Sequence, residues 1–361
     1  MASQLTRGIV TMAALTALLL TGGCNTVLLN ASGDIARQQG NLILVSTFLM
    51  ALIIVPVLVC IVVFAWRYRK NNTDATYKPD WNHSTQLELV IWGAPLLIII
   101  ALGLVTWITT HTLDPYRPLT RLDASRPIPA GTKPLLVEVV ALDWKWLFIY
   151  PELGIASVNE LATPVDVPVR FKITASSVMN SFYIPALAGQ IYAMPGMETS
   201  LYAVLNKQGV YDGFSANFSG AGFSDMRFKL RGMDQAGFDR WVETTRAGGG
   251  ALDRGAYLDL EKPTVKEPVH RYATVAPDLY GAILNRCVAP GTTCMSDTMA
   301  AAGHQGHEGN HGAKADVVAI NAAAQAALPA QKVSAATSPQ TATPPQITTQ
   351  PQAVHGAHHH E

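Results

Sequence analysis

Two long runs without a charged residue constrain this chain most. They cover residues 42–66 and 89–110 of a 361-residue sequence. At a rise of 1.5 Å per residue, a helix of about 22 residues is about 33 Å long and can cross a hydrocarbon core of roughly 30 Å. We therefore predict two transmembrane helices, at 42–66 and 88–110. The overall balance of 49% hydrophobic and 14% charged residues agrees with a membrane protein.

The segment that links the two runs sets their orientation. Residues 67–87 carry four basic side chains, whereas the segment at 24–41 carries only Arg37. Because basic loops stay in the cytoplasm, we predict that 67–87 is cytoplasmic and that both ends of the mature chain lie outside. Three arginines that follow the second run weaken this charge argument: Arg117, Arg121 and Arg126.

The first 23 residues have the pattern of a secretory signal peptide. Arg7 precedes an apolar stretch at 9–20, and small residues lead directly to Cys24. This order resembles a bacterial lipoprotein signal, in which the new N-terminal cysteine carries lipid, so we predict lipidation of Cys24. Leu20 lies four residues before the cysteine instead of the usual three. The alternative is a plain signal peptide with an incidental cysteine.

After a linker at 111–133, short strands are expected between residues 134 and 231. Val169, Phe171 and Ile173 alternate with charged residues, and a second alternating run covers 226–230. Roughly seven strands in about 100 residues favour a β-sandwich or a barrel. The other candidate strands are 135–141, 144–150, 190–194, 201–205 and 210–214.

An aromatic-rich segment at 232–287 and a polar tail at 288–361 complete the chain. We predict a helix at 234–245, capped by Asp234, and a short helix at 277–286. Only Cys287 and Cys294 are close enough in sequence to form a plausible disulfide. The tail lacks the residues for a core and is predicted to be disordered. It contains seven of the ten histidines. Such histidines can bind copper or zinc loosely, but a solvated tail is the favoured interpretation.

The stretch at 209–226, GVYDGFSANFSGAGFSDM, has the composition of a tight loop. Four glycines allow it to fold back on itself, and Ser215 and Ser219 are four residues apart. A copper site would have two thiolates at this spacing, and serine is a poor ligand for a soft metal. On its own the stretch is more typical of a Gly/Ser surface loop between two strands.

Several segments together resemble subunit II of the haem–copper terminal oxidases, most closely that of the bacterial cytochrome bo-type ubiquinol oxidases. They cover roughly residues 20–285. The resemblance implies a cupredoxin-like sandwich, with the aromatic-rich segment as part of the same family. The segments are FAWRYR at 64–69, WNHS at 81–84, TTH at 109–111, DWKWLFIYPELGIASVNE at 143–160, SVMNSFYIP at 177–185, QIYAMPGM at 190–197 and YDGFSANFSGAGFSDM at 211–226.

The resemblance also shows where the chain departs from copper-binding members of the superfamily. In those members, two thiolates, two imidazoles and a methionine hold a dinuclear copper centre. Here Ser215 and Ser219 stand at the thiolate positions, and Asn180 and Phe223 stand at the imidazole positions. Asn217 replaces the bridging glutamate, which also puts the associated magnesium contact in doubt. Met226 alone is retained, and a lone thioether cannot hold copper.

The resemblance implies a subunit II of a proton-pumping ubiquinol oxidase in the bacterial inner membrane, with the exported domain in the periplasm. No cofactor is expected in this chain, and haems and catalytic copper are expected in subunit I. The expected partners are subunit I, the other oxidase subunits, ubiquinol and membrane lipid, and the zero net charge suggests no nucleic-acid partner.

Glu88, at the cytoplasmic start of the second span, matches a proton-channel entry carboxylate in the family. From the sequence alone, an interfacial carboxylate stabilised by the helix N-terminus is the favoured interpretation, and the resemblance raises the proton-entry role above it. The alternatives for the whole chain are a cytochrome c oxidase subunit II and a membrane-anchored lipoprotein that handles copper through its His-rich tail.

Overall fold

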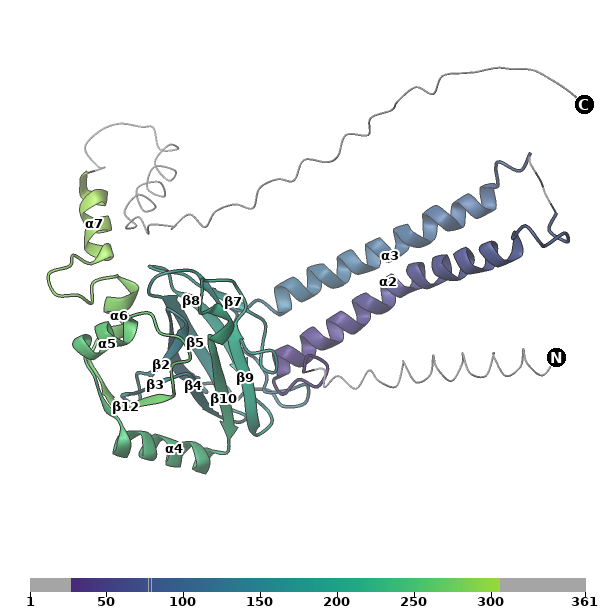
Figure 1. Ribbon diagram of the computed structural model, residues 1–361. Helices are drawn as coiled ribbons and strands as arrows, with labels where there is room; N and C mark the ends of the chain where they lie inside the picture. The colour runs from purple at the N-terminus through teal and green to yellow at the C-terminus, as the bar shows by residue number, and fades with distance from the viewer. Residues whose placement is uncertain (1–26, 77, 79, 306–361) are drawn as a thin grey trace, which may run out of the picture. The chain divides into compact units, whose positions relative to one another are not determined.

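The computed structural model describes residues 27–305 apart from 77 and 79 (Figure 1). The helices are α2 (Asp34–Arg67), α3 (Thr85–Thr112), α4 (Gln235–Gly248), α5 (Arg254–Glu261), α6 (Leu279–Leu284) and α7 (Met295–Gln305). The signal peptide, Cys24 and the tail from residue 306 lie outside the described residues.

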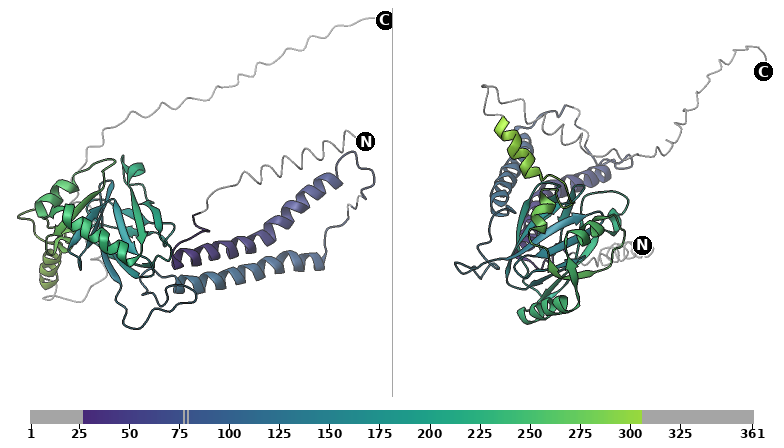
Figure 2. Two further views of the ribbon diagram at one scale, coloured as in Figure 1. Left: turned by 90° about the horizontal axis from the view of Figure 1, so that it is seen from below. Right: turned by 90° about the vertical axis from the view of Figure 1, so that its left-hand side faces the viewer.

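Helices α2 and α3 form the predicted membrane hairpin and run side by side (Figure 2). Both are long and apolar enough to cross a membrane. Each contains one proline, Pro56 or Pro95, which membrane helices tolerate because neighbouring groups satisfy the freed carbonyl. Helix α2 begins eight residues before the predicted span. Its first turns are polar, and they are held by contacts with the β-domain instead of by lipid.

Two sheets build the β-domain, as the cupredoxin-like prediction requires. The larger sheet has the order β11-β12-β3-β2-β1-β5-β8, and the smaller has the order β4-β10-β9-β6-β7. The strands are β1 (Leu135–Leu142), β2 (Lys145–Tyr150), β3 (Ile155–Val158), β4 (Glu160–Pro164), β5 (Pro168–Ala175), β6 (Asn180–Tyr183), β7 (Ile191–Ala193), β8 (Thr199–Val204), β9 (Gly209–Ser215), β10 (Arg227–Met233), β11 (Gly250–Leu252) and β12 (His270–Val275).

Strand β2 has both faces buried. Trp146, Phe148 and Tyr150 point into the core between the sheets, where the Trp146 and Phe228 rings lie 5.7 Å apart. Leu147 belongs to a second core on the other side of the larger sheet. Successive side chains of a strand point to opposite faces, so a strand that is apolar throughout needs cover on both faces.

The aromatic-rich segment supplies that cover. Its helices α5 and α6 pack over the second core through Tyr257, Leu260 and Tyr280 (Figure 1). Helix α4 confirms the predicted helix: Asp234 accepts a hydrogen bond from Gly237 N at 2.8 Å, and the helix ends before Gly249. The segment is helical only in part, because β11 and β12 extend the larger sheet.

The structure also corrects the predicted start of the disordered tail. Cys287 and Cys294 form a disulfide, and α7 follows directly at Met295–Gln305. Composition suggested a solvated tail from residue 288 because the segment lacks large apolar residues. The disulfide and the burial of Val288 hold the first part of this segment against the second core instead.

Glu138 on β1 faces the second core and gives a pH-dependent prediction. Burial raises the pKa of this carboxyl from 4.5 to about 7, with Lys172 opposing the shift and Glu198 adding to it. Because the folded-state pKa is the higher one, the protonated form favours folding. The stabilising effect of the bound proton is therefore complete below pH 4.5 and is lost as the pH rises through 7.

We expect Glu138→Gln to stabilise the purified chain at pH 8 by roughly 1 kcal/mol and to change little at pH 5. The value is below the full linkage energy because the side chain is only half-buried. Thermal unfolding at the two pH values measures the difference. Glu243→Gln, on the exposed face of α4, is the control and should show no such dependence. An equal gain for Glu138→Gln at both pH values would contradict the assignment.

Candidate functional site: the loop at 209–226

The positions that resemble copper ligands come together at one end of the smaller sheet. Asn180 begins β6, Ser215 ends β9, and Phe223 begins the 3-10 helix η1 (Phe223–Asp225). Strands β6 and β9 are antiparallel neighbours, with Phe182 paired to Ser215. The pairing of these two strands therefore brings residues 35 positions apart in the sequence into one site.

Asn180 and Ser215 form a buried hydrogen-bonded pair. The Ser215 hydroxyl donates to Asn180 Oδ1 at 3.1 Å, and Asn180 Nδ2 donates to the carbonyl of Val178 at 3.1 Å. Both side chains are nearly inaccessible, at 1% for Asn180 and 3% for Ser215. A buried polar group without a partner is costly, so the pair satisfies itself. The polar atoms at this position therefore point at each other.

The remaining loop positions are spread more widely. Met226 is fully buried in the core between the sheets, and its carbonyl accepts from Ser215 N at 3.2 Å. The Phe223 ring packs edge-on against Phe218 at 5.6 Å. The Ser219 hydroxyl is buried and has no hydrogen-bond partner among the described residues. Asn217 is half-buried, and its Nδ2 donates to the carbonyl of Phe218 at 3.3 Å.

Trp144 closes the loop from the side. Trp144 lies in the turn before β2, with φ 66°, and packs against the same core as Trp146. Its indole lies over the loop, where a Cβ at Gly222 would come within 2.4 Å of Trp144 Cδ2. Gly222 is therefore required for this close approach.

The donor set of this site does not fit a copper centre. It offers a carboxamide, two hydroxyls, a phenyl ring and one buried thioether, whereas copper sites use thiolates and imidazoles. Asn180 and Ser215 would also have to break their shared hydrogen bond to face a metal. In the described part of the chain, no group of three His, Cys, Asp or Glu side chains is placed to hold a metal ion.

Glu88 lies in the first turn of α3 and pairs with a residue that the sequence reasoning missed. His83 Nδ1 is 2.7 Å from Glu88 Oε1, and both side chains are at least half exposed. The segment WNHS carried the resemblance, but its histidine was given no role. An imidazole in contact with a carboxylate can exchange a proton with it.

A second missed residue is Glu160, which joins three elements. Its side chain is only 3% exposed. Glu160 Oε2 accepts from Arg231 on β10 at 2.6 Å, and Oε1 accepts from the indole of Trp241 on α4 and from Arg271 on β12, each at 2.9 Å. Burial would raise the pKa of Glu160, but these three donors outweigh it and lower the pKa below 4.5.

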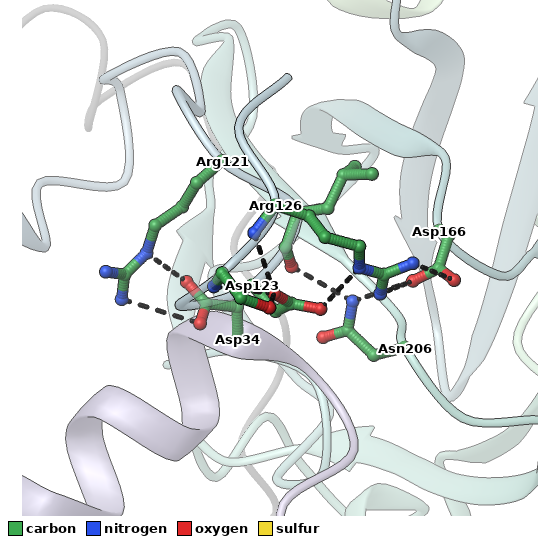
Figure 3. Close-up of polar contacts among 8 residues, drawn as sticks. Asp34, Arg121, Asp123, Arg126, Asp166 and Asn206 are labelled. Carbon is green, nitrogen blue, oxygen red and sulfur yellow. Dashed lines mark hydrogen bonds and ion pairs between the residues drawn. The ribbon is translucent and has the colours of Figure 1, made fainter. Parts of the chain in front are cut away.

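The junction between the hairpin and the β-domain is also polar (Figure 3). Asp34, at the start of α2, is buried and accepts from Arg121 Nε at 2.9 Å. Arg126 bridges Asp123 and Asp166, and Asn206 donates to Asp166 at 2.9 Å. The linker at 111–133 is therefore bound to both the hairpin and the sandwich.

Comparison with known proteins agrees with this architecture. The family model for the periplasmic domain of cytochrome c oxidase subunit II matches residues 137–232, and the COX aromatic-rich motif matches residues 246–291. The chain is 49% identical over 269 residues to cytochrome bo(3) ubiquinol oxidase subunit 2 of Pseudomonas putida, covering 74% of this chain and 83% of the relative. The chain belongs to the ubiquinol oxidase subunit 2 family.

Other members of the family give the same result. Ubiquinol oxidase subunit 2 of Acetobacter aceti is 44% identical, with 79% of this chain and 90% of the relative covered. Quinol oxidase subunit 2 of Bacillus cereus is 37% identical, with 70% of this chain and 84% of the relative covered. The predicted family and the cupredoxin-like fold are thus confirmed, and the two candidate membrane helices with the periplasmic domain fit an inner-membrane protein.

We expect Glu160→Gln to lower the stability of the purified chain by about 2 kcal/mol at pH 7. Loss of the buried charge leaves two arginines without their partner, and the cost is reduced because both arginines reach solvent. Since the folded-state pKa is lowered, the stabilisation is complete above pH 4.5 and disappears as the pH falls through the folded-state value.

Chemical unfolding at pH 7 measures this cost. The control is Glu152→Gln, which removes a carboxylate from an exposed ion pair with Lys133 and should change stability little. Equal effects of the two substitutions would show that Glu160 is no more than a surface charge.

Proposed function

We propose that this chain is a non-redox subunit of a proton-pumping oxidase that takes electrons from ubiquinol and reduces oxygen to water. The observation that carries the proposal is the buried Asn180–Ser215 pair, which occupies two of the positions where a copper centre would be held. Without soft ligands, the domain has no means to accept electrons from a periplasmic donor. A lipid-soluble donor that reaches subunit I within the bilayer does not need such a centre.

The proposed role of the domain is structural. Haems and catalytic copper belong to subunit I, and this chain holds neither. The sandwich and the aromatic-rich segment form a cap on the periplasmic side, and the hairpin anchors that cap in the membrane. The polar junction around Asp34, Arg121 and Arg126 supports this role, because it fixes the linker on both sides (Figure 3). Lipid on Cys24 would add a second membrane anchor.

The proposed entry point for protons is Glu88 together with His83. The pair lies at the cytoplasmic end of α3, next to the basic segment at 67–87. Ionisable groups at the edge of a membrane span often belong to proton pathways. Exposure of both side chains allows them to collect protons from the cytoplasm.

Donor specificity of the purified complex tests the main proposal. The complex should carry haem and oxidise ubiquinol-1 with oxygen uptake, and it should not oxidise reduced cytochrome c. Oxygen uptake with cytochrome c as the sole donor would contradict the proposal. A purified complex without haem would refute the assignment to an oxidase.

We expect Glu88→Gln to slow ubiquinol oxidation on the order of ten-fold, because the carboxylate that passes protons onward is removed. His83→Asn should slow turnover less, since Glu88 can still take protons from water. Asp80→Asn, a nearby exposed carboxylate in the same loop, is the matched control. Haem content reports assembly in each variant. Normal turnover in Glu88→Gln would show that this residue is only an interfacial charge and does not pass protons onward.

A further inference from the structure

A slot runs from the junction down into the membrane hairpin. Its outer part is a cavity of about 270 Å³ where α2 begins and α3 ends, with Gln38 and Arg117 among its polar side chains. Its inner part is about 540 Å³ and is lined by Leu42 and Ser46 of α2 and by threonines of α3. The two parts share Gln39, Leu113, Asp114 and Pro115, and so they adjoin.

Arg117 differs from the other two arginines that follow α3. Arg121 is paired with Asp34, and Arg126 is paired with Asp123 and Asp166 (Figure 3). Within the described part of the chain, Arg117 forms no ion pair, and its guanidinium makes one long hydrogen bond, 3.4 Å, to the carbonyl of His111. Basic residues are disfavoured on the exported side of a membrane protein, and Arg117 is exposed there, so its guanidinium is available to an anionic partner.

The position of Arg117 identifies the kind of anion. Helix α3 ends at Thr112, and its last turns carry Trp107 and His111, whose rings lie 4.5 Å apart. Trp and His are amphipathic, and Trp marks the level of lipid head groups. Because Arg117 follows soon after the end of α3, it would lie near the level of the lipid phosphates when the helix spans a membrane. A guanidinium binds phosphate through two parallel hydrogen bonds.

The inner part of the slot is suited to an acyl chain. The hydroxyls of Thr106, Thr109 and Thr110 each donate to a carbonyl of their own helix at 2.8 Å. Their hydrogen-bonding capacity is therefore used within α3, and their methyl groups remain for apolar contact. Leu42 lines the same groove from α2. The slot thus offers a charged group at its mouth and apolar contact along its length.

We propose that this slot binds one phospholipid of the periplasmic leaflet, with its phosphate on Arg117 and an acyl chain between α2 and α3. The cavity also contains Asp114, whose carboxylate can accept from an ammonium group. The site therefore favours a zwitterionic head group with a primary amine, as in phosphatidylethanolamine, over an anionic one. Binding there would join the hairpin, the linker and the bilayer at a single point.

Native mass spectrometry of the intact complex in mild detergent tests the proposal, with phosphatidylethanolamine as the added lipid. The wild-type complex should retain one tightly bound phospholipid. Arg117→Gln should lower its retention roughly five-fold, and Arg117→Lys should give an intermediate value because it keeps the charge but not the planar fork. Ser46→Phe should fill the groove and also lower retention. Lys133→Gln, an exposed charge outside the slot, should retain the lipid as wild type does.

Three results would overturn the proposal. Equal lipid retention in wild type and Arg117→Gln would show that Arg117 does not bind the lipid phosphate. Full lipid retention in Ser46→Phe would show that the acyl chain does not lie in the groove between α2 and α3. Retention of inorganic phosphate with no lipid would show that the cavity binds a free anion. Unchanged haem content in each variant shows that a loss of lipid does not arise from failed assembly.

Discussion

Glu160 is a buried carboxylate that β4 alone cannot neutralise. A charge removed from water needs donors, and the chain supplies them from three other elements: Arg231 on β10, Trp241 on α4 and Arg271 on β12. These elements can meet at one point only if the aromatic-rich segment lies against the sandwich. The segment is therefore an integral part of the periplasmic domain, and its β12 completes the larger sheet beside β3. The doubly covered strand β2 depends on the same arrangement.

The sandwich keeps its fold without metal ligands because aromatic packing holds it together. The rings of Phe182 and Phe228 are stacked at 5.4 Å, and Trp146 packs edge-on against both. At the rim, Asn180 and Ser215 satisfy each other, and Trp144 covers Gly222. The positions that resemble copper ligands are thus packing and hydrogen-bonding positions. The function we propose for the domain is to cap and anchor the membrane part of an oxidase.

Local patterns determine which parts of this structure the sequence predicts. The two spans, the helix that begins after Asp234 and the alternating strand β5 follow from charge, capping and periodicity over adjacent residues. Strands β3 and β4 were missed because they have four and five residues, all buried, so no alternation is visible. β12 was missed because it is recognisable as a strand only through its pairing with β3.

The site residues divide in the same way. The positions at 180, 215, 217, 219, 223 and 226 were found because a resemblance aligns them, and the structure brings Asn180 and Ser215 into contact. Glu160 was missed because its importance lies in partners that are distant in the sequence, and His83 was missed because its contact with Glu88 depends on how the chain enters α3. Arg271, for example, is 111 positions from the carboxylate it binds. Charge counting found the arginines at 117, 121 and 126, but only the structure shows which two are neutralised.

The central claim is that this domain is a cupredoxin-like fold without a copper centre. Electron paramagnetic resonance of the oxidised, purified complex tests it most directly, together with copper and haem analysis of the same sample. We expect no signal from a mixed-valence dinuclear copper centre, and no copper beyond that of subunit I. A dinuclear copper signal that disappears when Asn180 or Met226 is replaced would contradict the account.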